Sequence, residues 1–217
     1  MKLYKFTFNP FSENTYLVAA DSGQCLIVDP GMMDESEDAV LFDFISANNL
    51  IPTHVLNTHC HLDHILGNAS ACTRFNIEFS AHKNELVMLD RAPSASMMWG
   101  VPYRLSPQPH KFLAEGDRIA IGDNELEVLF TPGHAPGHVV FVSHSEKWVI
   151  GGDVLFEGSV GRVDLPGCNA KDLENSILQK LYTLPDEYTV FPGHGEETTI
   201  GREKVHNAFI RIGYSAF

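Results

Sequence analysis

The densest chemistry in this sequence lies in one short run, Thr58-His59-Cys60-His61-Leu62-Asp63-His64. Three imidazoles and one carboxylate fall within its last six positions. These are the ligand types that zinc, iron and manganese share. Histidines that only satisfy a polar core would be scattered along the chain, so this spacing predicts a metal site.

Three more candidate ligands stand alone further along the chain, each next to glycine. They are His134 in the string TPGH, Asp153 in GGD and His194 in FPGHG. Glycine lets the backbone turn sharply beside a ligand without a steric clash. Together with the dense run, these three residues predict a binuclear centre.

The candidate ligands divide into two sets and a bridge. We assign three histidines, His59, His61 and His134, to one ion. We assign one carboxylate and two histidines, Asp63, His64 and His194, to the other ion. Asp153 is the predicted bridge, because a carboxylate has two oxygens to share. Asp63 is also the candidate catalytic residue.

Two neighbouring divalent ions can hold one hydroxide between them and lower the pKa of water from about 15.7 to about 7. Such a centre needs no serine or cysteine nucleophile, and the sequence contains neither a strand-elbow serine motif nor a glycine-rich phosphate loop. No residue stands out as a general acid. This favours a leaving group that departs as an anion, such as a thiolate, over an amide nitrogen.

Spacing alone does not assign a role to two residues near the candidate ligands. Cys60 lies between two proposed ligands, and we interpret it as a structural thiol, with thiolate ligation as the alternative. His138 follows the His134 turn closely enough to contact a ligand, but its spacing does not make it one.

The composition describes an ordinary globular protein of 217 residues, with 44% hydrophobic residues and a formal net charge of −13. We expect a single domain over residues 1–217. The negative charge disfavours nucleic acid and anionic membranes as partners, and no apolar run is long enough to span a bilayer. The first residues alternate charged and apolar types, which predicts a strand and not a signal peptide, so we expect a cytoplasmic location.

The candidate ligands need strand ends to hold them, and the apolar pattern supplies these. Strands are predicted at residues 3–8, 16–20, 25–28, 53–57, 77–81, 118–121, 126–130, 138–143, 148–150 and 188–191. A helix is predicted from Ser36 to about Asn48, with Val40, Leu41, Phe44 and Ile45 on one face.

The second half of the sequence repeats this arrangement. Asn169 is predicted to cap a helix that carries Leu173, Ile177, Leu178 and Leu181, and a last short helix is predicted from Ile200. Residues 85–113 mix methionines, aromatics and prolines and predict either a substrate cover or a packed connector. The whole pattern predicts two helix-covered sheets, with the ligands on loops at one edge.

The motifs resemble the metallo-β-lactamase fold superfamily over nearly the whole chain, and most closely its short glyoxalase II-like hydrolases. The matching strings are NTYLV, VDPG, THCHLDH, TPGHAPGH, GGDVLFEGSVGR, FPGHG and TTIGREK. The resemblance implies an α/β fold, an αββα sandwich of two β-sheets flanked by helices, with two metals. It also implies that Asp29 lies beneath the metals and that the loop 158–166, with Arg162, binds substrate.

The resemblance leaves the reaction open between neighbouring branches. Full-length glyoxalase II enzymes have a further C-terminal helical domain with glutathione-binding basic residues, which this sequence does not show. The string GRVDLPGC is also similar to persulfide dioxygenases, which use one iron. The presence of His194 favours the hydrolase.

We therefore expect a two-metal hydrolase of small thioesters such as S-lactoylglutathione, with zinc as the first choice of metal and iron or manganese as alternatives. The attacking group would be a metal-bridging hydroxide. A mono-iron sulfur dioxygenase is the alternative activity, and a metal-binding protein without catalysis is the third hypothesis.

Overall fold

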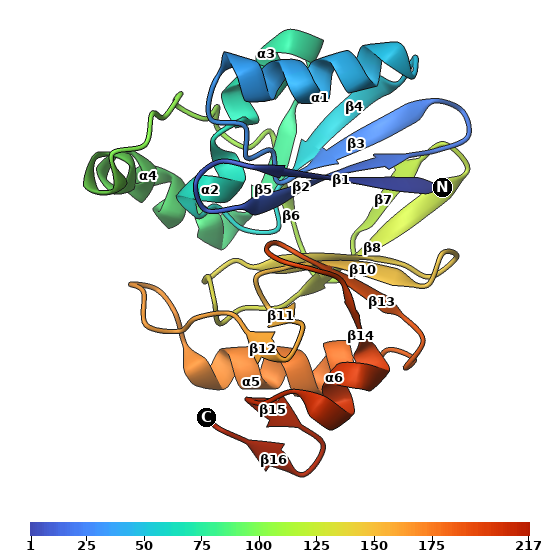
Figure 1. Cartoon of the computed structure of the whole chain (residues 1–217), viewed down its shortest axis with the longest axis vertical. Helices are drawn as coiled ribbons and strands as arrows, with labels where there is room; N and C mark the ends of the chain where they lie inside the picture. Colours follow the sequence, from blue (N-terminus) through green and yellow to red (C-terminus); the bar gives the residue numbers. More distant parts are fainter. The chain divides into compact units, whose positions relative to one another are not determined.

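The structure, a computed structural model, describes all 217 residues (Figure 1). The chain divides into two compact units. The first unit contains Met1–Leu113 and Ala120–Glu125, and the second contains Ala114–Ile119 and Leu126–Phe217. The single domain expected over residues 1–217 stays a prediction.

The first unit is built on a six-stranded sheet whose strands lie in sequence order. The strands are β1 (Lys2–Phe8), β2 (Glu13–Ala19), β3 (Gln24–Val28), β4 (Ile51–Leu56), β5 (Phe79–His82) and β6 (Lys111–Leu113). The first three are antiparallel, whereas β3 to β6 run parallel. Parallel strands end at a common edge, so the turns after β3 and β4 meet there.

The helices of the first unit are α1 (Glu35–Ala47), α2 (Leu62–Ile65), α3 (Asn68–Phe75), the 3₁₀ turn η1 (Lys83–Glu85) and α4 (Leu86–Trp99). Figure 1 shows α1 and α3 across one face of the sheet. Their apolar residues join those of the strands in one buried cluster, for example Leu41 and Ile45 of α1 with Leu17, Ile27 and Val55. Burial of this face holds α1 and α3 against the sheet.

Helix α1 begins where a local hydrogen-bonding signal places it. The side chain of Asp34 accepts hydrogen bonds from the backbone amides of Ser36 and Glu37, as an N-cap does. The prediction that Val40 faces the core is wrong, because its side chain is 54% exposed. Asp38 is buried instead, and it accepts a hydrogen bond from Ser70 Oγ and pairs with Arg104.

A second six-stranded sheet, in the order β14-β13-β10-β9-β8-β7, belongs to the second unit except for the parts of β7 and β8 within residues 120–125. Its strands are β7 (Arg118–Ile121), β8 (Asn124–Phe130), β9 (Val139–Ser143), β10 (Trp148–Gly152), β13 (Thr189–Pro192) and β14 (Thr198–Thr199). Two small hairpins are added, β11 (Leu155–Phe156) with β12 (Ser159–Val160), and β15 (Ile210–Arg211) with β16 (Tyr214–Ser215).

Two helices, α5 (Ala170–Gln179) and α6 (Ile200–His206), cover one face of the second sheet, and the 3₁₀ turn η2 (Leu181–Thr183) follows α5 (Figure 1). Leu173 and Ile177 of α5 and Ile200 of α6 pack with the valines of β9, β10 and β13. Asn169 caps α5, as predicted, by accepting hydrogen bonds from two backbone amides. The prediction that this helix carries Leu181 is wrong, because α5 ends at Gln179 and Leu181 lies in η2, and Leu178 is 39% exposed.

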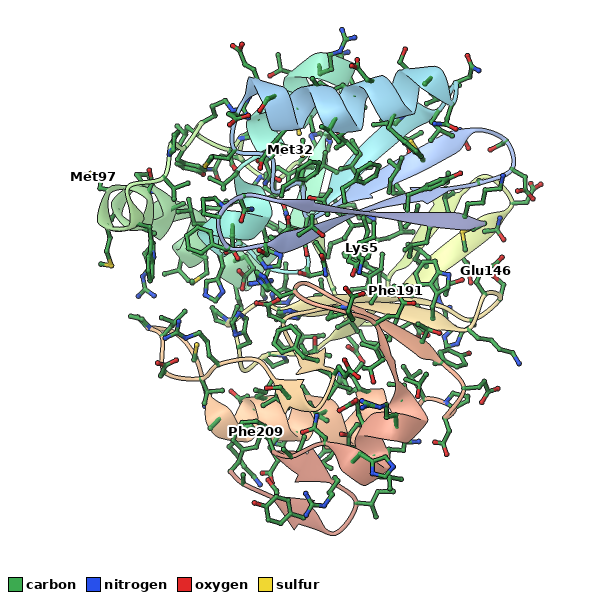
Figure 2. All side chains as sticks on the ribbon, viewed as in Figure 1. Lys5, Met32, Met97, Glu146, Phe191 and Phe209 are labelled. Carbon is green, nitrogen blue, oxygen red and sulfur yellow. The ribbon has the colours of Figure 1, made fainter.

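The irregular segment 85–113 is part helix and part loop, as expected. The first half of α4 is packed, with Met88, Leu89 and Ala92 in the buried cluster of the first unit. The C-terminal end of α4 is not packed, because Met97 (Figure 2) and Met98 are 83% and 79% exposed. The segment therefore acts in part as a packed connector, and its role as a substrate cover stays a prediction.

Two mixed sheets with helices on one face of each confirm the predicted α/β fold class. None of the helices is both long and apolar enough to cross a membrane.

Candidate metal centre

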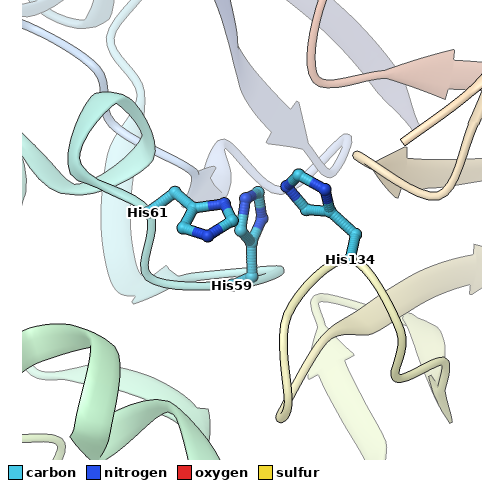
Figure 3. A group of neighbouring side chains, drawn as sticks. All are labelled: His59, His61 and His134. Atoms are coloured by element: carbon cyan, nitrogen blue, oxygen red, sulfur yellow. The ribbon is translucent and has the colours of Figure 1, made fainter. Parts of the chain in front are cut away.

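The first group of proposed ligands lies just beyond the end of β4. The strand ends at Leu56, and a short loop carries His59 and His61 into α2, which holds Asp63 and His64. The ring centroids of His59 and His61 are 4.7 Å apart (Figure 3), and those of His59 and His64 are 4.2 Å apart. Asp63 Oδ2 lies 3.7 Å from His64 Nε2. The structure thus brings the dense run together.

The buried carboxylate of Asp29, at the end of β3, organises this loop. Its Oδ1 accepts the backbone amide of Thr58 at 2.7 Å, and its Oδ2 accepts the Thr58 hydroxyl at 2.5 Å. His64 Nδ1 donates to Oδ2 at 3.2 Å. Asp29 has a positive φ of 50°, a conformation that turns its side chain under the loop at some backbone cost.

These contacts determine which nitrogen of each histidine is offered to a metal. The Thr58 hydroxyl gives its only proton to Asp29, so at 3.0 Å from His59 Nδ1 it can only accept, and Nδ1 carries the hydrogen. His64 Nδ1 carries its hydrogen toward the same carboxylate. Both rings then present the lone pair of Nε2, which is how metal-binding histidines are oriented by a second hydrogen bond.

A second buried carboxylate, Glu13 of β2, lies beside this network and was not predicted from the sequence. Its Oε1 is 3.8 Å from His64 Nδ1, and its Oε2 is 3.0 Å from Thr15 Oγ1. Burial raises the pKa of Glu13 well above its usual value, an effect that the nearby His64 opposes. Glu13 precedes the predicted strand 16–20 in a run of polar residues, so the sequence pattern did not mark it as buried.

A third carboxylate, Glu85, supports the loop from the other side and was also not predicted. It is fully buried in η1, and its Oε2 accepts the backbone amide of Cys60 at 2.7 Å. Cys60 lies between His59 and His61, so this bond fixes the backbone that carries both histidines.

The Cys60 thiol belongs to the apolar cluster of the first unit. Burial, with the charges of Glu85 and Asp29, raises its pKa well above the usual value, so the thiol stays protonated at neutral pH. This agrees with a structural thiol better than with a thiolate ligand.

We expect Cys60→Ala to bind metal within about threefold of the wild-type affinity and to lower the free energy of unfolding by about 1 kcal/mol. The Glu85 bond uses the backbone of residue 60 and survives the change. Chelator competition and urea unfolding measure the two effects. Loss of a bound ion would restore the thiolate alternative.

The second group of proposed ligands belongs to the second unit, where each lies just after a strand of its sheet. His134 follows β8, Asp153 follows β10 and His194 follows β13. Asp153 Oδ2 lies 3.4 Å from His134 Nε2 and 3.5 Å from His194 Nε2. The carboxylate predicted to bridge therefore lies between these two histidines.

The tautomer of His134, drawn in Figure 3, follows from its partner. Its Nδ1 lies 2.9 Å from the backbone carbonyl of Arg162, which can only accept, so Nδ1 carries the hydrogen and Nε2 has the lone pair. Cys168 Sγ donates to the carbonyl of His134 at 2.9 Å. The loop 161–168 thus contacts both the ring and the backbone of His134.

His138 holds Asp153 in place, which answers the question that its spacing left open. It is fully buried, and its Nε2 accepts the backbone amide of Asp153 at 3.1 Å. Its Nδ1 then carries the hydrogen and donates to Thr131 Oγ1 at 3.1 Å. Because Nε2 already accepts this hydrogen bond, His138 supports the proposed ligand Asp153 and does not offer Nε2 to a metal itself.

The guanidinium of Arg162 is held by a neighbour in its own loop. Its Nε and Nη2 donate to the two carboxylate oxygens of Asp164 at 2.7 and 2.8 Å. These hydrogen bonds lower the pKa of Asp164 to about 2, so the carboxylate stays charged across the physiological range. The guanidinium that is expected to bind substrate therefore already binds the Asp164 carboxylate through two hydrogen bonds.

The donor atoms of each unit fit a divalent metal by their chemistry. In the first unit, His59 and His64 offer Nε2, and Asp63 Oδ2 lies 3.7 Å from His64 Nε2. Nitrogen donors with fixed tautomers and carboxylate oxygens suit zinc, iron and manganese. The donor set therefore fits a metal without selecting one.

Comparisons with known proteins agree with this geometry. The family model described as the Metallo-beta-lactamase superfamily matches residues 8–194. The chain is 38% identical to "Probable metallo-hydrolase YqgX" of Bacillus subtilis, covering 99% of this chain and 100% of that protein. It is 33% identical to "Hydroxyacylglutathione hydrolase GloC" of Haemophilus influenzae, covering 92% and 93%.

Among solved structures, TTHA1623 in a di-iron-bound form is similar, with 39% identity, a TM-score of 0.86 and coverage of 95% of this chain and 100% of that one. The chain therefore belongs to the metallo-β-lactamase superfamily of metallo-hydrolases and has its fold.

Proposed function

We propose that this protein is a binuclear metallo-hydrolase of small thioesters such as S-lactoylglutathione. The observation that carries the proposal is that the Nδ1 atoms of His59, His64 and His134 are held by protein oxygens, which leaves Nε2 for metal. The similarity to a hydroxyacylglutathione hydrolase supports the thioester substrate.

The ligand assignment in this proposal is the one that the sequence predicted. One ion takes His59, His61 and His134. The other takes Asp63, His64 and His194. Asp153 bridges the two. Zinc is the proposed metal, with iron and manganese as alternatives, and the di-iron form of TTHA1623 makes iron a direct comparison.

Divalent ions at these residues would supply a nucleophile at neutral pH by lowering the pKa of water. The protein's own part is to hold the donors. Asp29 orients His59 and His64, and His138 fixes Asp153. None of these residues is a proton donor for the leaving group. A thiolate leaves without a proton donor, so thioesters are the substrate class that fits best.

Small molecules, not nucleic acid or membranes, are the proposed partners, in line with the net charge of −13. A cytoplasmic location is part of the same proposal.

The test measures bound metal and thioester hydrolysis on the purified protein. Two ions per chain and hydrolysis of S-lactoylglutathione that is lost on chelation and restored by zinc are expected. Fewer than two ions with no turnover would remove the proposal. One iron per chain with oxygen uptake on glutathione persulfide would establish the dioxygenase alternative.

His64→Ala separates an enzyme from a simple metal-binding protein. We expect it to lose one ion and to lower kcat by at least about 100-fold, because its imidazole is a proposed ligand. A binding protein would lose the ion and have no turnover to lose.

Arg162 is the proposed substrate-binding residue, and Asp164 competes with substrate for it. We expect Asp164→Asn to lower KM for a carboxylate-bearing thioester by about two- to fivefold, the strength of an exposed ion pair. KM for a neutral thioester should not change. Asp186→Asn, which removes an exposed carboxylate bonded to Lys204, is the matched control.

The pH dependence of this pair has a definite sign. The pKa of Asp164 is lowered to about 2, so its negative charge is lost only as the pH falls through that value. Its competition for Arg162 should therefore stay constant between about pH 5 and pH 9. A difference in KM between wild type and Asp164→Asn that varies over this range would contradict the assignment.

A further inference from the structure

A short segment of the second unit connects two parts of the proposed metal centre. It begins at Asp153, turns through the hairpin β11–β12 and ends at Arg162, whose carbonyl accepts the hydrogen of His134 Nδ1. The backbone amide of Gly161 closes the hairpin on the carbonyl of Val154 at 3.3 Å. The position of this hairpin therefore affects both the position of Asp153 and the orientation of the His134 ring.

The hairpin is fastened at its turn by a buried carboxylate of α6. Glu203 is fully buried, and its Oε2 accepts the backbone amide of Gly158 at 2.9 Å. Its Oε1 accepts the Thr198 hydroxyl at 2.6 Å. Glu203 lies 45 positions from Gly158 in the sequence, so the contact links distant parts of the unit.

Asn207 completes the attachment. It is fully buried, and its side-chain amide donates to Glu203 Oε2 at 2.7 Å and to the carbonyl of Ser159 at 3.0 Å. Glu203 and Asn207 thus hold adjacent backbone groups on the two sides of the turn, one amide and one carbonyl. Two anchors of opposite polarity fix both the position and the tilt of the peptide between them.

We propose that Glu203 and Asn207 are positioning residues for the second ligand group. They hold the β11–β12 turn, and the turn sets Asp153 at one end and the Arg162 carbonyl, with His134, at the other. The inference deepens the proposed function, on which it rests for the role of His134 and Asp153 as ligands. Neither positioning residue touches a ligand or substrate itself.

The alternative is that Glu203 only stabilises the end of the chain. Tyr182 provides the matched control, because its buried hydroxyl donates to the carbonyl of Ile210 at 2.8 Å and not to the hairpin. Tyr182→Phe removes one buried hydrogen bond from the same region and leaves Gly158 and Ser159 held.

The test compares metal affinity, measured by chelator competition, and the visible spectrum of the cobalt-loaded protein. Glu203→Ala should lower the affinity for one ion by about 10- to 100-fold and change the cobalt spectrum, the usual effect of losing support behind a ligand. Glu203→Gln should rescue both readouts to within about threefold, because one amide oxygen can still accept from Gly158 while its amine faces the Thr198 hydroxyl. Tyr182→Phe should lower Tm and leave both readouts unchanged.

Wild-type affinity and spectrum in folded Glu203→Ala would overturn the inference, as would an equal change in Tyr182→Phe. If Glu203→Ala does not fold, Asn207→Ala decides the matter, because it loses the Ser159 bond and should show the same change in metal affinity. Substrate is absent from these measurements. A wild-type protein that binds metal but hydrolyses no thioester would end the proposed activity, and the same affinities would still decide this inference.

Discussion

Replacing Asp29 with alanine is expected to lower the affinity of the protein for both metal ions, by about 10- to 100-fold each. A single lost partner behind a metal-binding histidine costs about 10- to 100-fold. Asp29 serves two histidines, since it bonds His64 directly and His59 through the Thr58 hydroxyl. Its removal frees both rings to rotate and to change tautomer, so Nε2 is no longer fixed toward the metal.

Asp29→Asn should have a smaller but clear effect. The amide oxygen can still accept the backbone amide of Thr58, but the amine cannot accept from the Thr58 hydroxyl or from His64. Asp38→Asn is the control, because Asp38 is another buried aspartate of this unit and bonds Ser70 and Arg104 instead. Equal metal affinity in the Asp29 and Asp38 variants, measured by chelator competition, would refute the role given to Asp29.

The elements that carry the ligands could be predicted because their signals are local. A capping side chain lies two or three residues from the amides it binds, as Asn169 does for α5. The dense ligand run needs only the turn that follows β4. The isolated candidate ligands His134, Asp153 and His194 were recognisable because each follows a strand at a glycine-rich turn.

The carboxylates that support the ligands could not be predicted in the same way. Glu85 and Glu203 bond backbone groups that lie 25 and 45 positions away. In the sequence each is a glutamate that follows a basic or polar residue, and glutamate side chains are mostly solvent-exposed. Only the tertiary fold brings each glutamate oxygen to the backbone amide from which it accepts a hydrogen bond.

The inward faces of the helices were predicted less accurately than their limits. Val40 and Leu178 are apolar but exposed, whereas Asp38 and Glu174 are buried. Each buried carboxylate has a cation beside it, Arg104 and Lys171 respectively. Arg104 comes from outside α1, whereas Lys171 lies on α5 itself, three positions before Glu174. A pattern of apolar residues cannot anticipate a face that an ion pair completes.

Substituting Gly161 with alanine is expected to lower both the stability of the second unit and its affinity for metal. A Cβ atom at this position would lie 1.9 Å from the backbone carbonyl oxygen of Asp153 and 3.1 Å from His134 Nδ1. Neither the carbonyl nor the ring can move without disturbing a proposed ligand. We expect the free energy of unfolding to fall by about 3 kcal/mol or more, the upper range for overpacking, and the affinity for metal to fall with it.

Gly158→Ala is the matched control, because it lies in the same hairpin and its Cβ would meet nothing within 4 Å. Its φ of +68° makes alanine cost about 1–2 kcal/mol through backbone strain, with no collision at the ligands. Urea unfolding and metal titration of both variants should therefore separate strain from collision. If Gly158→Ala lost as much metal affinity as Gly161→Ala, hairpin flexibility and not the contact with Asp153 would explain the loss. A normal affinity in Gly158→Ala, with a weakened one in Gly161→Ala, means that the close approach of residue 161 to Asp153 and His134 is what the metal centre requires.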